Sequence, residues 1–396
     1  MEKVFFTGTH RVRDPGDTLA AITPLLPRFG ITRLADVTGL DAIGIPVVMA
    51  VRPLAATLAV AQGKGATLDA ARVSAAMEAI EFWHAERAVP VPEASGAAAS
   101  DLGVPYPVTE LEQHAGSLLT SRSRMDWITA TSTLTGAPTL LPRPLVQIGR
   151  HVRSDWRIYM LTASTNGLAS GNTRAEAIIH GLYEVIERDT TSRLAGRPAP
   201  GSLDAAQEHI EPGTVTDPVC ASHLALLADA GAWVELIHLP NRFAVPVMVC
   251  HLWCEDAPSA IISGSGAHSD PGVALSRAIT EAAQSRLTHI SGSRDDITPL
   301  VYRPGHYQPP AAVQDTTCWA QVTSRYAHGR HTTDTGESAW LARTVTTVTG
   351  WEPMAVDLTQ GPYQQDDFAV VKVSAPGLIY SARHVIPRSE PLEATP

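Results

Sequence analysis

The pattern of apolar and polar residues along the chain predicts long helices separated by short β-branched runs. The stretch "SGNTRAEAIIHGLYEVIERD" at 170–189 has apolar residues at helical spacing after an opening that contains glycine. Segments 58–88 and 263–290 have the same order of a Gly-rich loop and a helical stretch, and another helix is predicted at 18–29. The three longer segments are therefore predicted to share one loop–helix arrangement.

Other stretches predict strands and irregular chain. β-branched runs bounded by Gly and Pro indicate strands within 31–53 and 233–254, and "FAVVKVSAPGLIY" at 368–380 indicates a buried strand that ends in a Pro-Gly turn. Residues 291–340 are rich in Pro, Gly, His and Thr and are expected to be irregular. Because the strands come in twos and threes between long helices, the sequence predicts an α+β fold with antiparallel or mixed sheets.

Composition then excludes several classes of protein. Hydrophobic residues make up 44% and charged residues 18% of the 396, which is typical of a globular chain. The net charge of −10 argues against nucleic-acid binding, which needs a basic surface. The sequence has neither a signal peptide nor an uncharged apolar stretch as long as a membrane helix, and its four cysteines form no CxxC pair. We therefore expect a cytoplasmic protein with reduced thiols.

The three longer helices carry polar residues at matching positions. In each, a small residue, a polar residue, a glutamate and a second acceptor follow one another at intervals of three, four and three residues. Residues three and four apart share a helical face, so each helix presents its acceptors together. The matched positions are Ala71, Ser74, Glu78 and Glu81; Ala177, His180, Glu184 and Glu187; and Ala274, Arg277, Glu281 and Gln284.

Carboxylates gathered in one cleft would need cations between them, because like charges at close range repel. Hard oxygen ligands of this kind suit Mg²⁺, which binds a few carboxylates, waters and substrate phosphates. Arg188, Arg277 and Arg286 are candidates to bind phosphate oxygens. The threefold recurrence favours a Mg-nucleotide cleft over three ordinary amphipathic helices with solvated faces. The predicted metal ligands are Glu78, Glu81, Glu184, Glu187 and Glu281.

This cleft would not be a standard nucleotide site. Leu58 stands where a P-loop requires its upstream glycine, and no GxGxxG follows a predicted strand. Lys64, in "QGKGAT", either reaches a phosphate or is an exposed turn lysine, and the sequence leaves both interpretations open.

Five separated blocks of the sequence resemble the YcaO family. They are "GITRLADVTGLDAIGIPVVMAVRP", "GKGATLDAARVSAAMEAIE", "SGNTRAEAIIHGLYEVIERD", "SRAITEAAQSR" and "FAVVKVSAPGL". The resemblance implies a YcaO-like fold with three pseudo-repeated Gly-loop–helix units around a cleft for ATP and Mg²⁺. It also implies an enzyme that phosphorylates the oxygen of a peptide backbone amide after a nucleophile has added, and that installs azolines, thioamides or amidines in ribosomally made peptides.

The same resemblance sets our expectations for domains and single residues. We expect one domain over 1–396, with an N-terminal arm and helix (1–30), a nucleotide-binding core (31–290), an irregular segment (291–345) and a C-terminal strand and tail (346–396). Glu78, Glu81, Glu184, Glu187 and Glu281 match metal-binding positions. Expected to contact the nucleotide are Arg11, Thr18, Lys64, Ser74, Asn172, Arg188 and Arg277.

A general base must take a proton from the attacking group. His180 lies one helical turn before Glu184 and is a candidate for this role beside the catalytic candidate Arg188, although a structural histidine bonded to that carboxylate is equally compatible with the sequence. Azoline-forming members commonly end in a PxPxP tail whose carboxylate reaches the active site, whereas this sequence ends "PRSEPLEATP". The usual assignment of the base to that tail is therefore in doubt.

The expected reaction is ATP-dependent cyclodehydration of a precursor peptide to a macroamidine or azoline, with the nucleophile supplied by the substrate. A fused peptide-recognition domain is not expected, so the chain resembles standalone members such as those of bottromycin-type pathways. The alternatives are thioamide formation with sulfide and a separate TfuA-type partner, an amide-bond ligase, and a non-catalytic nucleotide-binding scaffold. We expect a precursor peptide as partner, but neither nucleic acid nor a membrane; a homo-oligomer stays open.

Overall fold

The chain folds into two compact units, Met1–Trp83 with Ala199–Asp334, and His84–Pro198 with Thr335–Pro396. The computed structural model describes residues 1–87, 90–113, 117–149, 160–161, 163–195, 207–256, 261–294, 310–326, 331–359 and 368–380. The tail "PRSEPLEATP" lies outside these ranges. The expected single domain over 1–396 stays a prediction.

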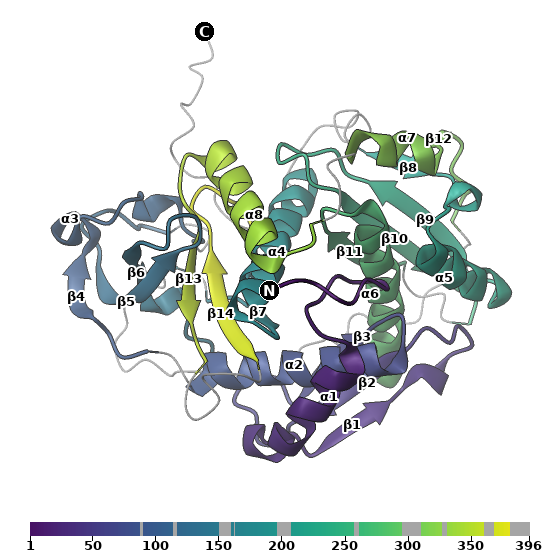
Figure 1. The fold of residues 1–396 in the computed structure, drawn as a ribbon, viewed down its shortest axis with the longest axis horizontal. Coiled ribbons are helices and arrows are strands. Elements are labelled where there is room, and N and C mark those ends of the chain that lie inside the picture. Colours follow the sequence, from purple (N-terminus) through teal and green to yellow (C-terminus); the bar gives the residue numbers. More distant parts are fainter. Residues whose placement is uncertain are drawn as a thin grey trace, which may run out of the picture. The chain divides into compact units, whose positions relative to one another are not determined.

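The first unit contains two sheets with their helices (Figure 1). An antiparallel sheet has the order β1-β2-β3, and a five-stranded sheet has the order β11-β10-β9-β8-β12, in which only β12 and β8 pair in parallel. The strands are β1 (Arg33–Asp36), β2 (Val47–Val51), β3 (Val60–Lys64), β8 (Glu208–Ile210), β9 (Trp233–His238), β10 (Val247–Trp253), β11 (Ile262–Ala267) and β12 (Thr316–Thr317). The helices are α1 (Pro15–Ile22), α2 (Leu68–Arg87, to Trp83 in this unit), α5 (Pro218–Asp229), α6 (Pro271–Ser291) and α7 (Trp319–Thr323).

The second unit is built on one antiparallel sheet of the order β4-β5-β13-β14-β7, with β6 added beside β5. Its strands are β4 (Ala94–Ala98), β5 (Arg124–Ser132), β6 (Pro138–Pro142), β7 (Leu168–Gly171), β13 (Met354–Asp357) and β14 (Ala369–Ser374). Its helices are α3 (Ala99–Leu102), α4 (Arg174–Ala195) and α8 (Asp334–Thr349). The expected α+β class with antiparallel and mixed sheets is confirmed.

In both units, glycines bring a strand against the backbone of the helix that follows it. A Cβ on Gly63 of β3 would stand 2.0 Å from the amide nitrogen of Ala75 in α2. A Cβ on Gly171 of β7 would stand 2.5 Å from the nitrogen of Ala177, and one on Gly264 of β11 would stand 2.3 Å from that of Ala282. Only glycine allows so close an approach. Whether these strand–helix pairs form a pseudo-repeat stays a prediction.

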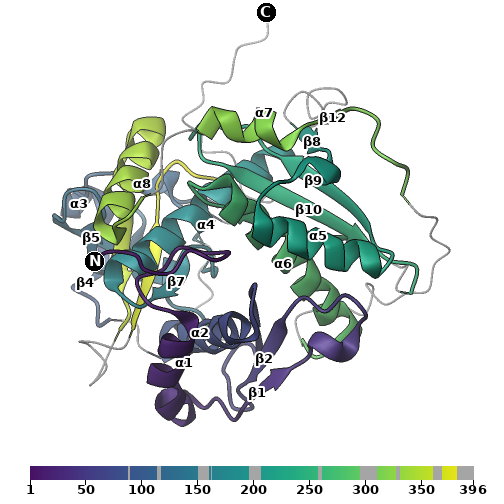
Figure 2. The same cartoon turned by 45° about the vertical axis from the view of Figure 1, so that its right-hand side comes forward.

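Helices α5 and α6 start in the same way and pack against the five-stranded sheet (Figure 2). Each begins with Asp-Pro: the carboxylates of Asp217 and Asp270 cap the first turn, and proline occupies the first helical position, where it loses no intrahelical hydrogen bond. The core between sheet and helices joins Leu236, Met248 and Leu252 to residues of α6. Cys220, Cys250 and Cys254 are free thiols buried in this core.

The prediction that residues 291–345 are irregular was wrong in part. Residues Trp319–Thr323 form α7 and Asp334–Thr349 form α8. The Thr-rich sequence of α8 has low helix propensity, but Leu341, Ala342 and Val345 are fully buried on one face, and tertiary packing overrides propensity there. The helix expected at 18–29 starts earlier, at Pro15, and continues as a 3₁₀ helix over Thr23–Phe29. None of the helices in the described part of the chain is long and apolar enough to cross a membrane.

Replacing Gly264 by alanine tests the strand–helix contact. The new Cβ would overlap the backbone of α6, so we expect Gly264→Ala to lower the free energy of unfolding by about 3 kcal/mol or more. Gly39→Ala is the matched control, because no atom lies within 4 Å of its ideal Cβ. Urea unfolding followed by circular dichroism measures both, and equal unfolding midpoints would contradict the contact.

Candidate functional site

In the first unit, β3 connects the glutamates of α2 and α6. The amide of Gln62 donates to the Glu78 carboxylate at 3.0 Å, and the ammonium of Lys64 lies 2.7 Å from the Glu281 carboxylate. The side-chain amide of Gln284 donates to the backbone oxygen of Gln62 at 3.3 Å. β3 therefore brings Glu78, Lys64 and Glu281 together, and Lys64 is bound to a carboxylate instead of standing alone on a turn.

Burial and the neighbouring charged groups determine the pKa of the Glu78 carboxyl. Burial raises the pKa of the Glu78 carboxyl, and the nearby Glu281 carboxylate adds to the effect. The Gln62 amide and the cations Arg294 and Lys64 oppose it, but burial prevails. A carboxyl with a raised pKa gains stability when a cation approaches, so this pair of glutamates is a chemically suitable place for a divalent ion.

The remaining predicted residues of α2 lie on the same helix. Ser74 is packed against β3, since its backbone carbonyl carbon lies 2.6 Å from the ideal Cβ position of Gly63. Glu81 is half-buried, one turn after Glu78. These positions are consistent with a shared face.

The N-terminal arm and the start of α6 contribute basic groups around His268. Burial lowers the pKa of His268 well below its usual value, and His10, Lys3, Arg277 and Arg11 lower it further. Arg11 and Arg277, both predicted to contact the nucleotide, thus act on one imidazole. We call Lys3, Arg11 and Arg277 the basic cluster.

Thr18 and Arg286 make contacts within the protein that differ from the nucleotide contacts expected of them. The hydroxyl of Thr18 donates to the backbone oxygen of Asp14 at 3.1 Å within the first turn of α1. Arg286, a candidate for binding phosphate, is buried and forms ion pairs with Asp41 at 3.0 Å and Asp256 at 2.7 Å. The suggestion that Arg286 binds phosphate is therefore corrected: it joins two surface loops to α6.

In the second unit, α4 carries the other predicted set. The side-chain amide of Asn172 donates to Glu176 at 3.0 Å, which fixes it at the start of the helix. Arg188 lies 3.9 Å from Glu184, which precedes it by one helical turn. Glu187 is 4% exposed. His180 is half-buried one turn before Glu184 in α4.

Sequence reasoning missed Lys372, in the centre of β14. The residue is 3% exposed, and its ammonium donates to the backbone oxygens of Ser164 and, at 2.7 Å, Asn166. Burial lowers the pKa of Lys372 to about 8, opposed by the carboxylates of Glu112 and Glu184. The sequence could have revealed this residue, because a lysine inside the apolar run "FAVVKVS" is a cation that needs partners when it is buried.

The five predicted metal ligands are divided between the units. Glu78, Glu81 and Glu281 belong to the first and Glu184 and Glu187 to the second. Within the described ranges, no group of three or more His, Cys, Asp or Glu side chains is arranged to hold a metal ion. Convergence of all five around Mg²⁺ stays a prediction.

Comparison with known proteins shows the family to which this chain belongs. A family model described as YcaO cyclodehydratase, ATP- and Mg²⁺-binding, matches residues 62–379. An uncharacterised protein of Mycobacterium tuberculosis is 38% identical over 387 residues, which are 95% of this chain and 84% of that protein. An uncharacterised protein from the tfuA 3′ region of Rhizobium leguminosarum bv. trifolii is 37% identical over 74% of this chain and 70% of its own.

A solved structure supports the same fold. YcaO from Methanopyrus kandleri, bound with AMPPCP and Mg²⁺, matches with a TM-score of 0.72 and 25% identity, over 96% of this chain and 95% of that one.

Replacing Lys372 by methionine gives a pH test of the buried lysine. Below about pH 8 the lysine is charged in the folded and unfolded states, so the full cost of burying the charge is present. Between pH 8 and the ordinary value of 10.5 the folded state loses the proton first, and that cost falls as pH rises. The wild type should therefore gain stability relative to Lys372→Met between pH 8 and 10. Urea unfolding at several pH values measures the difference, and a constant difference would contradict the assignment.

Proposed function

Since this chain belongs to the YcaO family of ATP- and Mg²⁺-binding cyclodehydratases, we propose that it uses ATP to activate a backbone amide of a peptide. The observation that carries the proposal is the group formed by Glu78, Lys64 and Glu281, which β3 brings together from separate helices. Acidic and basic side chains at one place suit a Mg-nucleotide, in which cation and phosphates need opposite partners.

The proposed reaction starts when a nucleophile of the peptide, an amine, thiol or hydroxyl, adds to the carbonyl carbon of a backbone amide. The oxygen of the adduct then attacks the γ-phosphorus of ATP, and the bond to ADP breaks. Loss of this phosphate, with a proton from the former amide nitrogen or the attacking group, leaves a C=N bond. The peptide loses the elements of one water, and ATP becomes ADP and phosphate.

Mg²⁺ would neutralise charge on the phosphates during this transfer. Glu78 and Glu281 are suitable first ligands, because burial and mutual repulsion raise the pKa of Glu78 and a cation relieves both effects. Glu81, Glu184 and Glu187 are proposed to complete the set. Lys64, bound to Glu281 at 2.7 Å, is placed to exchange that carboxylate for a phosphate oxygen.

The other predicted residues contribute binding and proton transfer in this proposal. Arg11 and Arg277 of the basic cluster would bind phosphate oxygens, and Asn172, Ser74 and Thr18 would orient the nucleotide. Arg188, which lies 3.9 Å from Glu184, would stabilise the charge that develops on phosphate transfer. His180 is the proposed base.

We propose ring closure to a macroamidine or azoline as the reaction, in accordance with the family description as cyclodehydratases. A second candidate is thioamide formation with a TfuA-type partner and sulfide. It is favoured by one observation, the 37% identical relative from a tfuA 3′ region. In that reaction sulfide is the external nucleophile, and the same phosphorylation removes the amide oxygen.

Replacing Glu281 by glutamine should strongly lower activity without unfolding the protein. We expect ATP turnover with a candidate precursor peptide to fall about 100-fold, because a charge that acts on the transferred phosphate is lost. The Lys64–Glu281 pair is partly exposed, so its loss should cost under ~1 kcal/mol of stability. Glu184→Gln and Glu187→Gln are expected to lower turnover as well.

The matched control is Asp69→Asn, which removes a carboxylate from the exposed Asp69–Arg72 pair of α2. ATP turnover is followed by phosphate release and stability by thermal unfolding. Turnover in Glu281→Gln equal to that in Asp69→Asn would contradict the proposed site, and no turnover in the wild type would favour the scaffold alternative.

The mass of the peptide product separates the two candidate reactions. With ATP and Mg²⁺ alone, ring closure should reduce the mass of the precursor peptide by one water. An obligatory requirement for sulfide, with the mass change of oxygen replaced by sulfur, would select thioamide formation instead. Mass spectrometry of the peptide, with and without sulfide, makes this distinction.

A further inference from the structure

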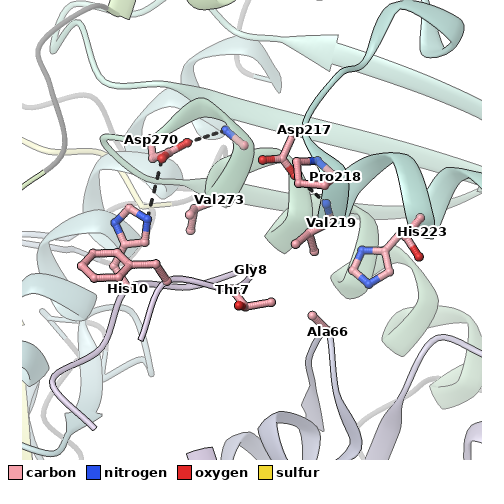
Figure 3. A pocket seen from close by; sticks show the side chains of 13 residues that line it. Thr7, Gly8, His10, Ala66, Asp217, Pro218, Val219, His223, Asp270 and Val273 are labelled. Atoms are coloured by element: carbon pink, nitrogen blue, oxygen red, sulfur yellow. Dashed lines mark hydrogen bonds and ion pairs between the residues drawn. The ribbon is translucent and has the colours of Figure 1, made fainter. Parts of the chain in front are cut away.

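The first unit contains a cavity of about 510 Å³ between the N-terminal arm and the first turns of α5 and α6 (Figure 3). Its walls include Phe6 and His10 from the arm, Val219 and His223 from α5, and Val273 from α6. Val219, Ser222 and His223 lie three and four residues apart and thus share one face of α5. None of these cavity residues is among those proposed above to bind ATP or Mg²⁺.

Two carboxylates border this cavity at the starts of the helices. One oxygen of Asp217 accepts from the amides of Val219 and Cys220, and its second oxygen lies 2.5 Å from the ideal Cβ position of Gly272. The capping oxygen of Asp270 lies 3.3 Å from the same position. Gly272 therefore allows two carboxylates to approach each other, an arrangement that a bound cation stabilises.

His223 points into the cavity from α5, the helix that Asp217 caps (Figure 3). Its side chain is 3% exposed, and Nδ1 has no hydrogen-bond partner among the residues that the structure describes. Burial lowers the pKa of His223, opposed by Asp217, so the imidazole is neutral near pH 7. A buried ring nitrogen without a partner costs free energy that a ligand with a suitable polar group recovers.

The cavity walls otherwise favour an apolar stem with a positive end. Within the described ranges its walls contain no lysine or arginine, and Phe6, Ala66, Pro218, Val219 and Val273 supply apolar surface. His10 stands at one end of the cavity, 3.7 Å from Asp270, and His223 stands at the other end (Figure 3). Asp217, close to Asp270 across Gly272, belongs to the same helix end as His223. The basic cluster adjoins the His10 end, because both His10 and the cluster act on His268. The Asp217 end is therefore the favourable place for a cation.

We propose that this cavity binds an arginine side chain of the peptide substrate, with its guanidinium between Asp217 and His223. The planar guanidinium offers five N–H donors, enough for the second Asp217 oxygen and the His223 ring nitrogen together. The methylene stem packs on the apolar walls. The proposal rests on the proposed function in taking a peptide as the substrate, and it assigns the cavity a role in positioning that peptide.

The experiment measures binding of Nα-acetyl-L-arginine amide to the full chain without nucleotide, by ligand-observed NMR titration. The citrulline counterpart has the same shape without the charge, and we expect it to bind at least about tenfold more weakly. Asp217→Asn should weaken arginine amide binding by a similar factor while preserving the helix cap, since asparagine caps as well as aspartate. Asp14→Asn, which changes the cap of α1 outside the cavity, is the matched control.

A second variant covers the case in which Asp217→Asn does not fold. Ser222 is an exposed residue of α5 at the cavity, and Ser222→Phe should block binding of the arginine amide by filling the space. Equal binding of the citrulline compound, or undiminished binding in both variants, overturns the proposal. Displacement of the arginine amide by AMPPCP and Mg²⁺ also overturns it, because the cavity would then belong to the nucleotide site.

These measurements are independent of the proposed reaction. Binding of the arginine amide needs no ATP turnover, so an inactive enzyme that still binds it would refute the reaction and leave the cavity assigned. An active enzyme that binds the arginine and citrulline compounds equally would refute only the cavity.

Discussion

Close contact between glycine-bearing strands and the backbones of the following helices is the constraint on which the rest of the structure depends. Gly63 and Gly264 lie so near α2 and α6 that no side chain fits between them. The position of each helix against its strand is thereby constrained. Because Gln62 and Lys64 flank Gly63, their contacts with Glu78 and Glu281 follow from this packing. The small size of Gly63 thus determines where Lys64 and the two glutamates lie relative to one another.

The first unit uses buried and half-buried ion pairs for different purposes. Arg286 is almost fully buried with Asp41 and makes two hydrogen bonds to Asp256, so the charges are satisfied within the protein. The Lys64 ammonium lies 2.7 Å from the Glu281 carboxylate, and both side chains remain partly exposed. A buried, multiply bonded pair is costly to break, whereas a partly exposed pair exchanges partners at a lower cost. This difference separates an arginine that supports the fold from a lysine available to a ligand.

Helical periodicity and glycine positions predicted the three long helices in outline, but not the contact of Lys64 with the Glu281 carboxylate. They could not predict α8, whose many threonines favour other structures and whose helix depends on the burial of Leu341 and Val345. They also failed for Lys372 and Arg286. The role of each is decided by partners distant in sequence, such as Asn166 for Lys372 and Asp41 for Arg286, and a single sequence does not reveal which long-range partners meet.

The N-terminal arm has little helix or strand, yet backbone hydrogen bonds hold it in place. Val4 and Phe5 both donate to the backbone oxygen of Arg11, and Lys3 donates to Thr332 at 2.8 Å. The arm is thus closed on itself and attached to a later segment of the same unit, which places His10 against His268 with ring centroids 4.7 Å apart. Backbone groups supply these contacts, while the side chains of His10 and Arg11 both act on the pKa of His268. The arm therefore joins the basic cluster and the cavity wall in one short segment, and its conformation links the two.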